Sequence, residues 1–181
     1  MTFFRLYRKI RGLAKGLIYR IIYLNKIKGN NFSIGKGGEI LLIGNQARIE
    51  FGKNNVIRNN VNIRVTNGSL KIGDNTFIND NCCLVSREII EIGNNTLIGQ
   101  NVCIYDNNHL FSGGDLIKNQ GFDTQKVIIG DNVWIGSNVV VLQGVTIGNN
   151  SVIAAGAIVN ENIKENTIYY NKITKVMKSI R

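Results

Sequence analysis

The sequence has no proline, one histidine, one tryptophan and three cysteines among its 181 residues. A lone histidine excludes a zinc centre with several imidazole ligands, unless each subunit of an oligomer contributes one. Cys82 and Cys83 are adjacent, whereas a zinc-binding pair needs two to four residues between its members. We therefore expect no metal site, and we interpret Cys82, Cys83 and Cys103 as core-packing residues of a chain in a reducing cytoplasm.

An apolar run long enough to cross a membrane is also missing. Arg20 divides the longest apolar stretch of the N-terminal region into pieces far shorter than the ~18 residues that a membrane-spanning helix needs. No small-residue cleavage pattern follows this stretch, so the sequence does not predict a secretory signal. We expect a cytoplasmic location.

Acidic residues are absent from residues 1–28, which hold eight lysines and arginines and so most of the net charge of +10. Apolar residues recur there at helical spacing, from Phe3 to Leu24, which predicts a basic amphipathic helix. Two interpretations are open. The helix lies on the inner face of an anionic cytoplasmic membrane, or it packs its apolar stripe on the rest of the chain or on a neighbouring subunit. Nucleic acid is not expected as a partner, because no base-reading module follows.

A six-residue repeat dominates the rest of the chain. Near its end, aliphatic residues stand at every sixth position: Ile129, Ile135, Val141, Ile147, Ile153 and Val159. A helix requires apolar recurrence near 3.6 residues and a half-buried strand requires 2, so neither fits. A period of six is typical of a parallel β-helix, in which three six-residue edges form one triangular coil. The 20 glycines and the many asparagines suit its tight corners.

The same register extends upstream with interruptions. Its members there are Ile34, Ile43, Ile49, Phe51, Ile57, Ile63, Ile72, Ile78, Leu84, Ile92, Ile98 and Ile104. They predict one all-β solenoid domain of about five to six coils over residues 29–160, if each coil takes about 18 residues. A basic tail or short helix, residues 161–181, is expected to follow it.

The longest interruption of the repeat lies between Ile104 and Ile129. The intervening residues 105–126 are polar and rich in glycine and asparagine, which predicts a loop extruded from one corner of the solenoid. This loop carries His109, and histidine is the side chain whose ordinary pKa lets it take up and return a proton near neutral pH. His109 is therefore either a general base or a solvated surface histidine, and we favour the base.

Two segments resemble a known family. Residues 129–159, IGDNVWIGSNVVVLQGVTIGNNSVIAAGAIV, and the YDNNH stretch at 105–109 are similar to the hexapeptide-repeat acyltransferases. The similarity is strongest to their galactoside/maltose acetyltransferase and polysaccharide O-acetyltransferase branch. The resemblance implies a left-handed parallel β-helix and a homotrimer with each active site between two subunits. It also implies acetyl-CoA as the co-substrate, stretched along the coils.

The resemblance assigns roles to individual residues. His109 matches the general base that takes the proton from an acceptor hydroxyl, and Asn79 matches an acceptor-side asparagine. Trp134 matches a residue that lines the path of the cofactor, although a large apolar side chain on a coil face also suits plain packing. Ser137 and Ala155 match positions whose backbone groups bond the pantetheine arm.

The charged residues follow the family pattern less closely. Lys175 and Lys178 match cations near the phosphates of coenzyme A, and an ordinary solvated tail is the alternative. Asp106 is our candidate for a carboxylate on the substrate side that orients the imidazole of His109. Gln143 stands where the family has a proline.

These features predict an acetyl-CoA-dependent O-acetyltransferase that acts on a sugar hydroxyl in a precursor of a cell-surface or capsular polysaccharide. The basic N-terminus motivates the choice of acceptor, because lipid-linked glycans are built at the membrane. The alternatives are an N-acetyltransferase of an amino-sugar nucleotide and a non-catalytic solenoid scaffold. The lone histidine of the extruded loop argues against the scaffold.

Overall fold

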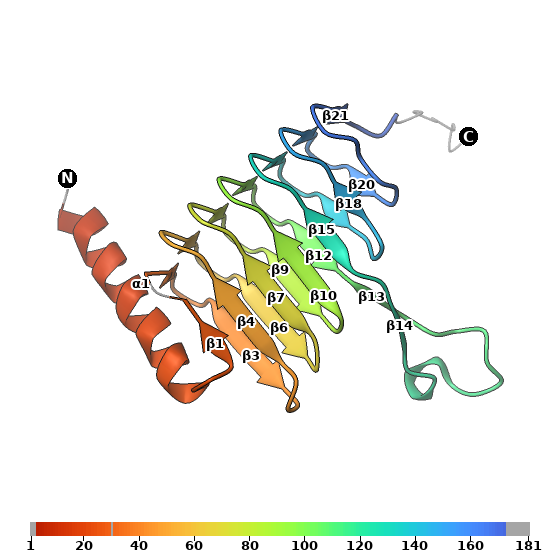
Figure 1. Ribbon diagram of the computed structural model, residues 1–181, viewed down its shortest axis with the longest axis horizontal. Coiled ribbons are helices and arrows are strands. Elements are labelled where there is room, and N and C mark those ends of the chain that lie inside the picture. The colour runs from red at the N-terminus through yellow and green to blue at the C-terminus, as the bar shows by residue number, and fades with distance from the viewer. Residues whose placement is uncertain (1–2, 30, 173–181) are drawn as a thin grey trace, which may run out of the picture.

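The chain forms a β-helix with one α-helix packed against its N-terminal end (Figure 1). The computed structural model describes residues 3–29 and 31–172. Helix α1 (Phe3–Ile22) is followed by parallel strands that stack into three sheets of six, seven and six strands. The predicted all-β solenoid is confirmed, with six complete coils and part of a seventh.

Each coil contributes one strand to each sheet, always in the order A, B, C. Sheet A contains β1 (Ile27–Lys28), β4 (Arg48–Phe51), β7 (Ser69–Ile72), β10 (Ile89–Ile92), β15 (Val127–Ile129) and β18 (Thr146–Ile147). Sheet B contains β2 (Ser33–Ile34), β5 (Val56–Ile57), β8 (Phe77–Ile78), β11 (Leu97–Ile98), β16 (Trp134–Ile135), β19 (Val152–Ile153) and β21 (Ile168–Tyr169). Sheet C contains β3 (Glu39–Ile43), β6 (Asn62–Thr66), β9 (Cys83–Ser86), β12 (Cys103–Tyr105), β17 (Val140–Val141) and β20 (Ile158–Val159). The turns between the sheets form three edges, called here A/B, B/C and C/A.

The β-helix begins with β1 at Ile27 and ends with β21 at Tyr169, so it extends beyond the predicted range 29–160 at both ends. Ile27 is buried in the first coil although lysines flank it, and Ile163 is buried beyond the polar Asn160–Glu161 pair. Charged and polar neighbours hide both inward positions from a search for aliphatic periodicity.

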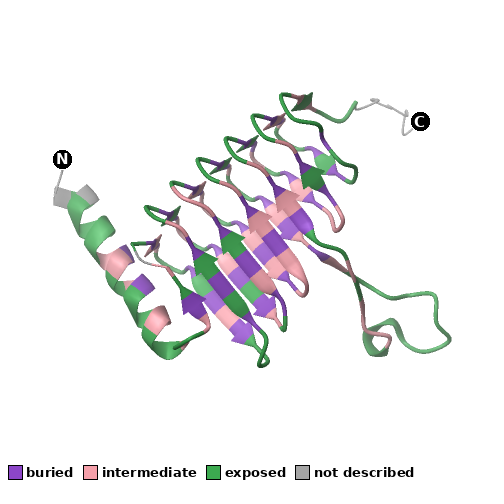
Figure 2. Ribbon diagram, viewed as in Figure 1, coloured by how far each residue is buried: buried purple, intermediate pink, exposed green. Residues whose placement is uncertain are grey.

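Buried residues recur on the strands of every coil (Figure 2), and most of them are aliphatic. The six residues of the C-terminal register, from Ile129 to Val159, are each at most 1% exposed. Burying one such side chain contributes roughly 1.5–3 kcal/mol, and each coil gains this only against its neighbours. One expectation for the first coil is wrong: Ile43 is 43% exposed, and Ile40 fills the inward position in register with Ile63. Ile40 stands six residues after the buried Ile34, so the first coil keeps the regular spacing that the choice of Ile43 departed from.

Asparagines form the corners. Asn54, Asn75 and Asn95 have φ values of 59°, 56° and 55°, in the left-handed region that asparagine tolerates better than most residues. Their side chains also bond from coil to coil, with Nδ2 of Asn54 donating to Oδ1 of Asn75 at 3.1 Å and Asn75 to Asn95 at 3.2 Å. The asparagine content therefore serves both turn geometry and coil stacking.

Helix α1 packs on the first coil through its glycines. A Cβ atom on Gly16 would lie 2.5 Å from the carbonyl oxygen of Phe32, and one on Gly12 would lie 3.1 Å from Cβ of Ser33. The apolar stripe lies on another face of the helix, where Ile10 is 58% exposed and Ile21 60%. The interpretation in which this stripe packs on the chain's own β-helix is therefore wrong. Among the described residues, no helix has both the length and the hydropathy to cross a membrane.

Candidate active site

The extruded loop leaves the β-helix at the C/A edge, between β12 and β15 (Figure 1). Strands β13 (Asn107–His109) and β14 (Phe122–Thr124) form an antiparallel pair, and a short 3-10 helix, η1 (Ile117–Asn119), lies between them. Because these strands pair only with each other, the loop projects from the solenoid as a separate arm. Its tip is apolar and exposed, with Phe111 at 74%.

Asp106 closes the base of this arm. Its carboxylate is fully buried and accepts hydrogen bonds from Ser86 Oγ (2.8 Å), Arg87 N (2.7 Å) and Glu88 N (2.9 Å). Such a carboxylate cannot turn toward His109 without leaving these donors unpaired in the interior. The prediction that Asp106 orients His109 or faces the substrate is corrected: it holds the start of the arm on the preceding coil.

His109 is exposed near the start of the arm, and an aromatic ring holds it in place. The rings of His109 and Phe122 have centroids 4.3 Å apart and planes inclined by 41°. The guanidinium carbon of Arg87 lies 3.4 Å from the centroid of the same phenyl ring. Phe122 was missed by the sequence reasoning, although an aromatic residue in an otherwise polar loop is a visible signal. The imidazole is thus positioned by stacking, and its nitrogens make no hydrogen bond within residues 3–29 and 31–172.

Gln143, the departure from the family proline, ties the arm to the fifth coil. Its Nε2 donates to Asp123 Oδ2 at 2.7 Å, next to Phe122. Gly144 N also donates to Gln125 O at 3.0 Å. The glutamine therefore takes a structural role that a proline side chain cannot provide.

The other predicted site residues that the structure describes lie at or beside a different edge of the β-helix, the B/C edge. Asn79 follows β8 and Ser137 follows β16, so both lie at the B/C edge, and Ala155 lies there one coil beyond Ser137. Trp134 projects from the outer face of sheet B beside this edge and is 57% exposed, so it does not pack inside its own chain.

In the first four coils, a side-chain oxygen accepts the N–H of the second residue of the B/C turn, and this stops at Ser137. In three of them the oxygen lies one coil ahead: Lys36 donates to Asn59 (3.0 Å), Asn59 to Asp80 (2.8 Å) and Gln100 to Ser137 Oγ (3.3 Å). In the third coil, the oxygen lies in the same turn, where Asp80 N donates to Oδ1 of Asn79. Ala155 offers no side-chain acceptor to Ser137. As a result, the N–H groups of Ser137 and Ala155 have no partner within the described part of the chain.

Asp80 strengthens the upstream half of this edge. Besides accepting from Asn59 N, its carboxylate forms an ion pair with Arg58 at 3.3 Å. Burial acts to raise the pKa of Asp80, but the hydrogen bond from Asn59 and the guanidinium of Arg58 together lower it below the ordinary value. Asn79, next to it, uses its own Oδ1 to accept from Asp80 N at 2.9 Å, and its Nδ2 has no partner among the described residues.

One chain does not bring the two halves of the site together. His109 projects from the C/A edge, whereas Asn79, Ser137 and Ala155 lie at the B/C edge, across the width of sheet C. The two predicted phosphate-binding residues, Lys175 and Lys178, lie outside the described residues.

Cysteine and metal chemistry find no support at these edges. Cys82 is buried, its thiol donates to Gly99 O at 3.0 Å, and burial raises its pKa to about 11. Burial also raises the pKa of Cys83. Thiols protonated at neutral pH are poor nucleophiles. The core-packing role fits Cys82, whereas Cys83 and Cys103 are only partly buried and lie in register at outward positions of sheet C, which corrects the expectation for these two. Within the described ranges, no group of three or more histidine, cysteine, aspartate or glutamate side chains is placed to hold a metal ion.

Comparisons with known proteins add a family match and several relatives. A family model described as "Bacterial transferase hexapeptide (six repeats)" matches residues 126–161. Over 147 residues, the chain is 34% identical to an Escherichia coli (strain K12) protein named "Putative lipopolysaccharide biosynthesis O-acetyl transferase WbbJ". That match covers 75% of this chain and 74% of the relative.

Two solved structures are similar in fold and sequence. A hexapeptide-repeat acetyltransferase from Vibrio cholerae, complexed with acetyl coenzyme A, is 30% identical with a TM-score of 0.53, covering 74% of this chain and 65% of that chain. A variant of AntD, an N-acyltransferase from Bacillus cereus, in complex with dTDP and coenzyme A, is 25% identical with a TM-score of 0.71. This second match covers 86% of this chain and 83% of that one.

Proposed function

Because the chain belongs to the hexapeptide-repeat acyltransferase family, we propose that it transfers the acetyl group of acetyl-CoA to a hydroxyl of a sugar. The observation that carries the proposal is a pair of backbone N–H groups at the B/C edge that have no partner among the described residues. Two adjacent coils there present free backbone N–H groups, at Ser137 and Ala155, beside the exposed indole of Trp134. A pantetheine arm has amide carbonyls that such donors bind, and donors fixed on a rigid coil lose little by reorganising.

The chemistry requires one base and no covalent enzyme intermediate. In the proposed step, an imidazole nitrogen of His109 accepts the proton of the acceptor hydroxyl while its oxygen attacks the thioester carbonyl. The tetrahedral intermediate then expels the coenzyme A thiolate, which takes up a proton to become the free thiol. The buried Cys82 is not needed as an acyl carrier, because its thiol stays protonated.

We propose a homotrimer that assembles each site from two chains. The separation of His109 from the B/C edge supports this arrangement, since a neighbouring copy can lay its arm along the edge. Apolar surface is exposed on both sides of such a contact: Leu97 (50%) and Trp134 (57%) on sheet B, and Phe111 (74%) and Leu116 (63%) on the arm.

Mixing two defective chains tests the shared site. His109→Ala removes the base and Ala155→Asp obstructs the proposed donor positions, so each trimer alone is expected to turn over slowly when acetyl-CoA is kept well below the raised KM. If a site takes its arm from one chain and its edge from the next, refolding a 1:1 mixture should restore about a quarter of the sites. If base and donors belong to the same chain, the mixture stays as slow as each variant alone.

The acceptor is proposed to be a sugar of a cell-surface or capsular polysaccharide precursor. The name of the Escherichia coli relative, which refers to lipopolysaccharide biosynthesis and O-acetyl transfer, supports this choice. A second candidate is N-acetylation of an amino sugar linked to a nucleotide, which the likeness to AntD favours. Mild alkali separates the two, because it cleaves an O-acetyl ester and leaves an N-acetyl amide intact.

Contact of residues 1–28 with the inner face of a cytoplasmic membrane is part of the proposal. Exposure of Ile10, Leu17 and Ile21 on the outside of α1 supports it, together with the basic side chains of the same helix. Replacement of the exposed Ile10, Leu17 and Ile21 by serine should release the protein from anionic liposomes while the buried strand β1 stays in place. Full-length wild type that never binds such liposomes would contradict this part.

Thioester cleavage in the presence of acceptor tests the catalytic role of His109. His109→Ala should slow acetyl transfer by about 10² to 10⁴, the usual contribution of a general base. The melting temperature should hardly change, because the side chain is exposed. Asn108→Ala, an exposed neighbour on the same strand, is the matched control and should keep the wild-type rate. Equal turnover by the wild type and His109→Ala would remove His109 from the mechanism.

A further inference from the structure

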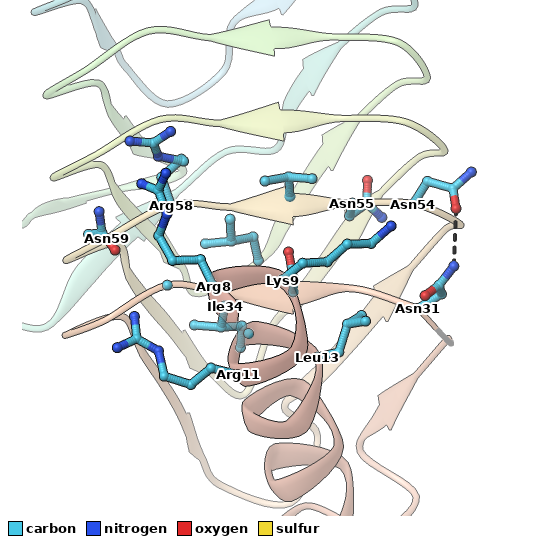
Figure 3. A pocket seen from close by; sticks show the side chains of 15 residues that line it. Arg8, Lys9, Arg11, Leu13, Asn31, Ile34, Asn54, Asn55, Arg58 and Asn59 are labelled. Carbon is cyan, nitrogen blue, oxygen red and sulfur yellow. Dashed lines mark hydrogen bonds between the residues drawn. The ribbon is translucent and has the colours of Figure 1, made fainter. Parts of the chain in front are cut away.

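A cationic cleft opens between helix α1 and the first two strands of sheet B (Figure 3). Its volume is about 620 Å³. Helix α1 contributes Arg8, Lys9 and Arg11, and the turn after β5 contributes Arg58 and Asn59. Figure 3 shows Arg8, Arg11 and Arg58 reaching one side of the cleft and Lys9 reaching the other. The cleft is therefore walled by positive charge from two separate elements.

Among the residues that the structure describes, no acidic side chain lines this cleft. Asp80 pairs with Arg58 at 3.3 Å from outside the lining, which leaves Arg8, Lys9 and Arg11 without a lining counter-charge. Several cations along a concave surface raise the local concentration of anions. Guanidinium groups in particular present paired N–H donors that match the oxygens of a phosphate. The chemistry of the lining is that of a phosphate or diphosphate site.

The position of the cleft relates it to the proposed acceptor side. Arg58 N donates to Ile78 O and Asn79 N donates to Ile98 O, so Arg58 and Asn79 occupy the same turn position in successive coils. The B/C edge therefore carries, in order, the cationic cleft, Asn79, and the free N–H groups of Ser137 and Ala155.

From this order we infer that the acceptor sugar carries a phosphate or diphosphate group, and that the cleft binds it. The inference rests on the proposed function, because it takes Asn79 as the acceptor side of the edge. The anionic group belongs to the acceptor and is distinct from the phosphates of coenzyme A, since the free N–H donors lie farther along the edge than Asn79. A lipid-linked sugar and a nucleotide-linked sugar both present this chemistry.

Titration with inorganic diphosphate, at saturating coenzyme A, tests the cleft without any need for turnover. The wild type should bind one diphosphate per chain. Arg8→Gln combined with Arg11→Gln should weaken this binding by about tenfold or more, because charge-assisted bidentate contacts are lost. Lys71→Gln combined with Lys164→Gln removes the same charge from exposed positions elsewhere and should change the binding less than about twofold. Arg58→Gln is a second probe, and circular dichroism checks that losing its ion pair leaves the fold intact.

Two competition arms identify the source of the phosphate. Displacement of diphosphate by uridine diphosphate assigns the group to a nucleotide-linked acceptor, and displacement only by vesicles containing a polyprenyl diphosphate assigns it to a lipid-linked one. Absence of saturable binding, or an equal loss in the two double variants, would overturn the inference. If sugars are acetylated but diphosphate does not bind, the proposed function stands without the cleft. If diphosphate binds specifically but no sugar is acetylated, the cleft is an anion site and the proposed function fails.

Discussion

The two halves of the B/C edge share one backbone geometry but differ in whether a side-chain oxygen accepts the N–H of the second turn residue. In the upstream half, the N–H of Asn59 is used by the carboxylate of Asp80 at 2.8 Å. In the downstream half, the N–H of Ser137 has only the methyl group of Ala155 ahead of it, and no partner among the residues described. Where the side-chain oxygen is missing, the backbone N–H group stays available to a ligand, so this part of the repeat can act as a binding surface. The comparison predicts that the two halves respond differently to the same kind of substitution.

Closing the downstream half should have the largest effect. Ala155→Asp places a carboxylate where Asp80 stands relative to Asn59, so it should capture the N–H of Ser137. We expect the KM for acetyl-CoA to rise about tenfold or more, because a bound donor is no longer available and the new charge repels phosphates. Steady-state kinetics measures this, with exposed Asn160→Asp as the control for added charge. An unchanged KM would mean that these donors do not contact the cofactor.

Opening the upstream half should affect stability instead. Asp80→Ala removes the hydrogen bond to Asn59 N and the ion pair with Arg58. The expected loss is about 1–2 kcal/mol in the free energy of unfolding, measured by urea denaturation. The KM for acetyl-CoA should stay within about twofold, which a shift as large as that of Ala155→Asp would contradict.

The free energy of unfolding should depend on pH through the ionisation of the Asp80 carboxylate. The native pKa of Asp80 is lowered below its ordinary value of 3.8, so its contribution is fully present above that pH. This contribution should disappear as the pH falls through the lower native pKa. The difference in unfolding free energy between the wild type and Asp80→Asn should therefore shrink below about pH 4. A difference that stays constant from neutral pH down to pH 2 would argue against the lowered pKa.

Removal of the Ser137 hydroxyl should have the smallest effect. Ser137→Ala deletes the Oγ that accepts from Gln100 N at 3.3 Å but keeps the backbone N–H that faces the proposed cofactor. Stability should fall by less than about 1 kcal/mol, and the KM for acetyl-CoA should not change. A large rise in KM would assign the contact to the side chain and not to the backbone.

Periodicity predicted the solenoid because inward positions are chemically uniform. Every coil needs an aliphatic residue there, so the pattern survives without knowledge of any contact. The prediction was wrong at Ile43, because four consecutive aliphatic residues, 40–43, offer several choices and Ile40 is the one that keeps the spacing of six from Ile34. It also missed Ile27, whose lysine neighbours conceal its burial.

Contacts between distant segments were harder to predict. Asp106 precedes His109 by three residues, yet its carboxylate bonds to the turn at Arg87, one coil earlier. Glycine disfavours a helix interior, yet Gly12 and Gly16 form the surface through which α1 docks on the first coil. The distance of His109 from the B/C edge could not be predicted, because the sequence does not show at which edge the arm leaves the β-helix.

The docking of α1 also bears on how the β-helix ends. The first strands of a parallel stack expose unpaired backbone groups to which another chain can add, and stacked β-structures polymerise in this way. Helix α1 lies over β2, and Lys15 Nζ donates to the carbonyl oxygens of Gly35 and Gly38 just beyond that strand. A bulky residue at Gly16 would push this lid away from Phe32. Such a variant should keep its coils and lose its solubility, forming end-to-end fibres instead of discrete particles.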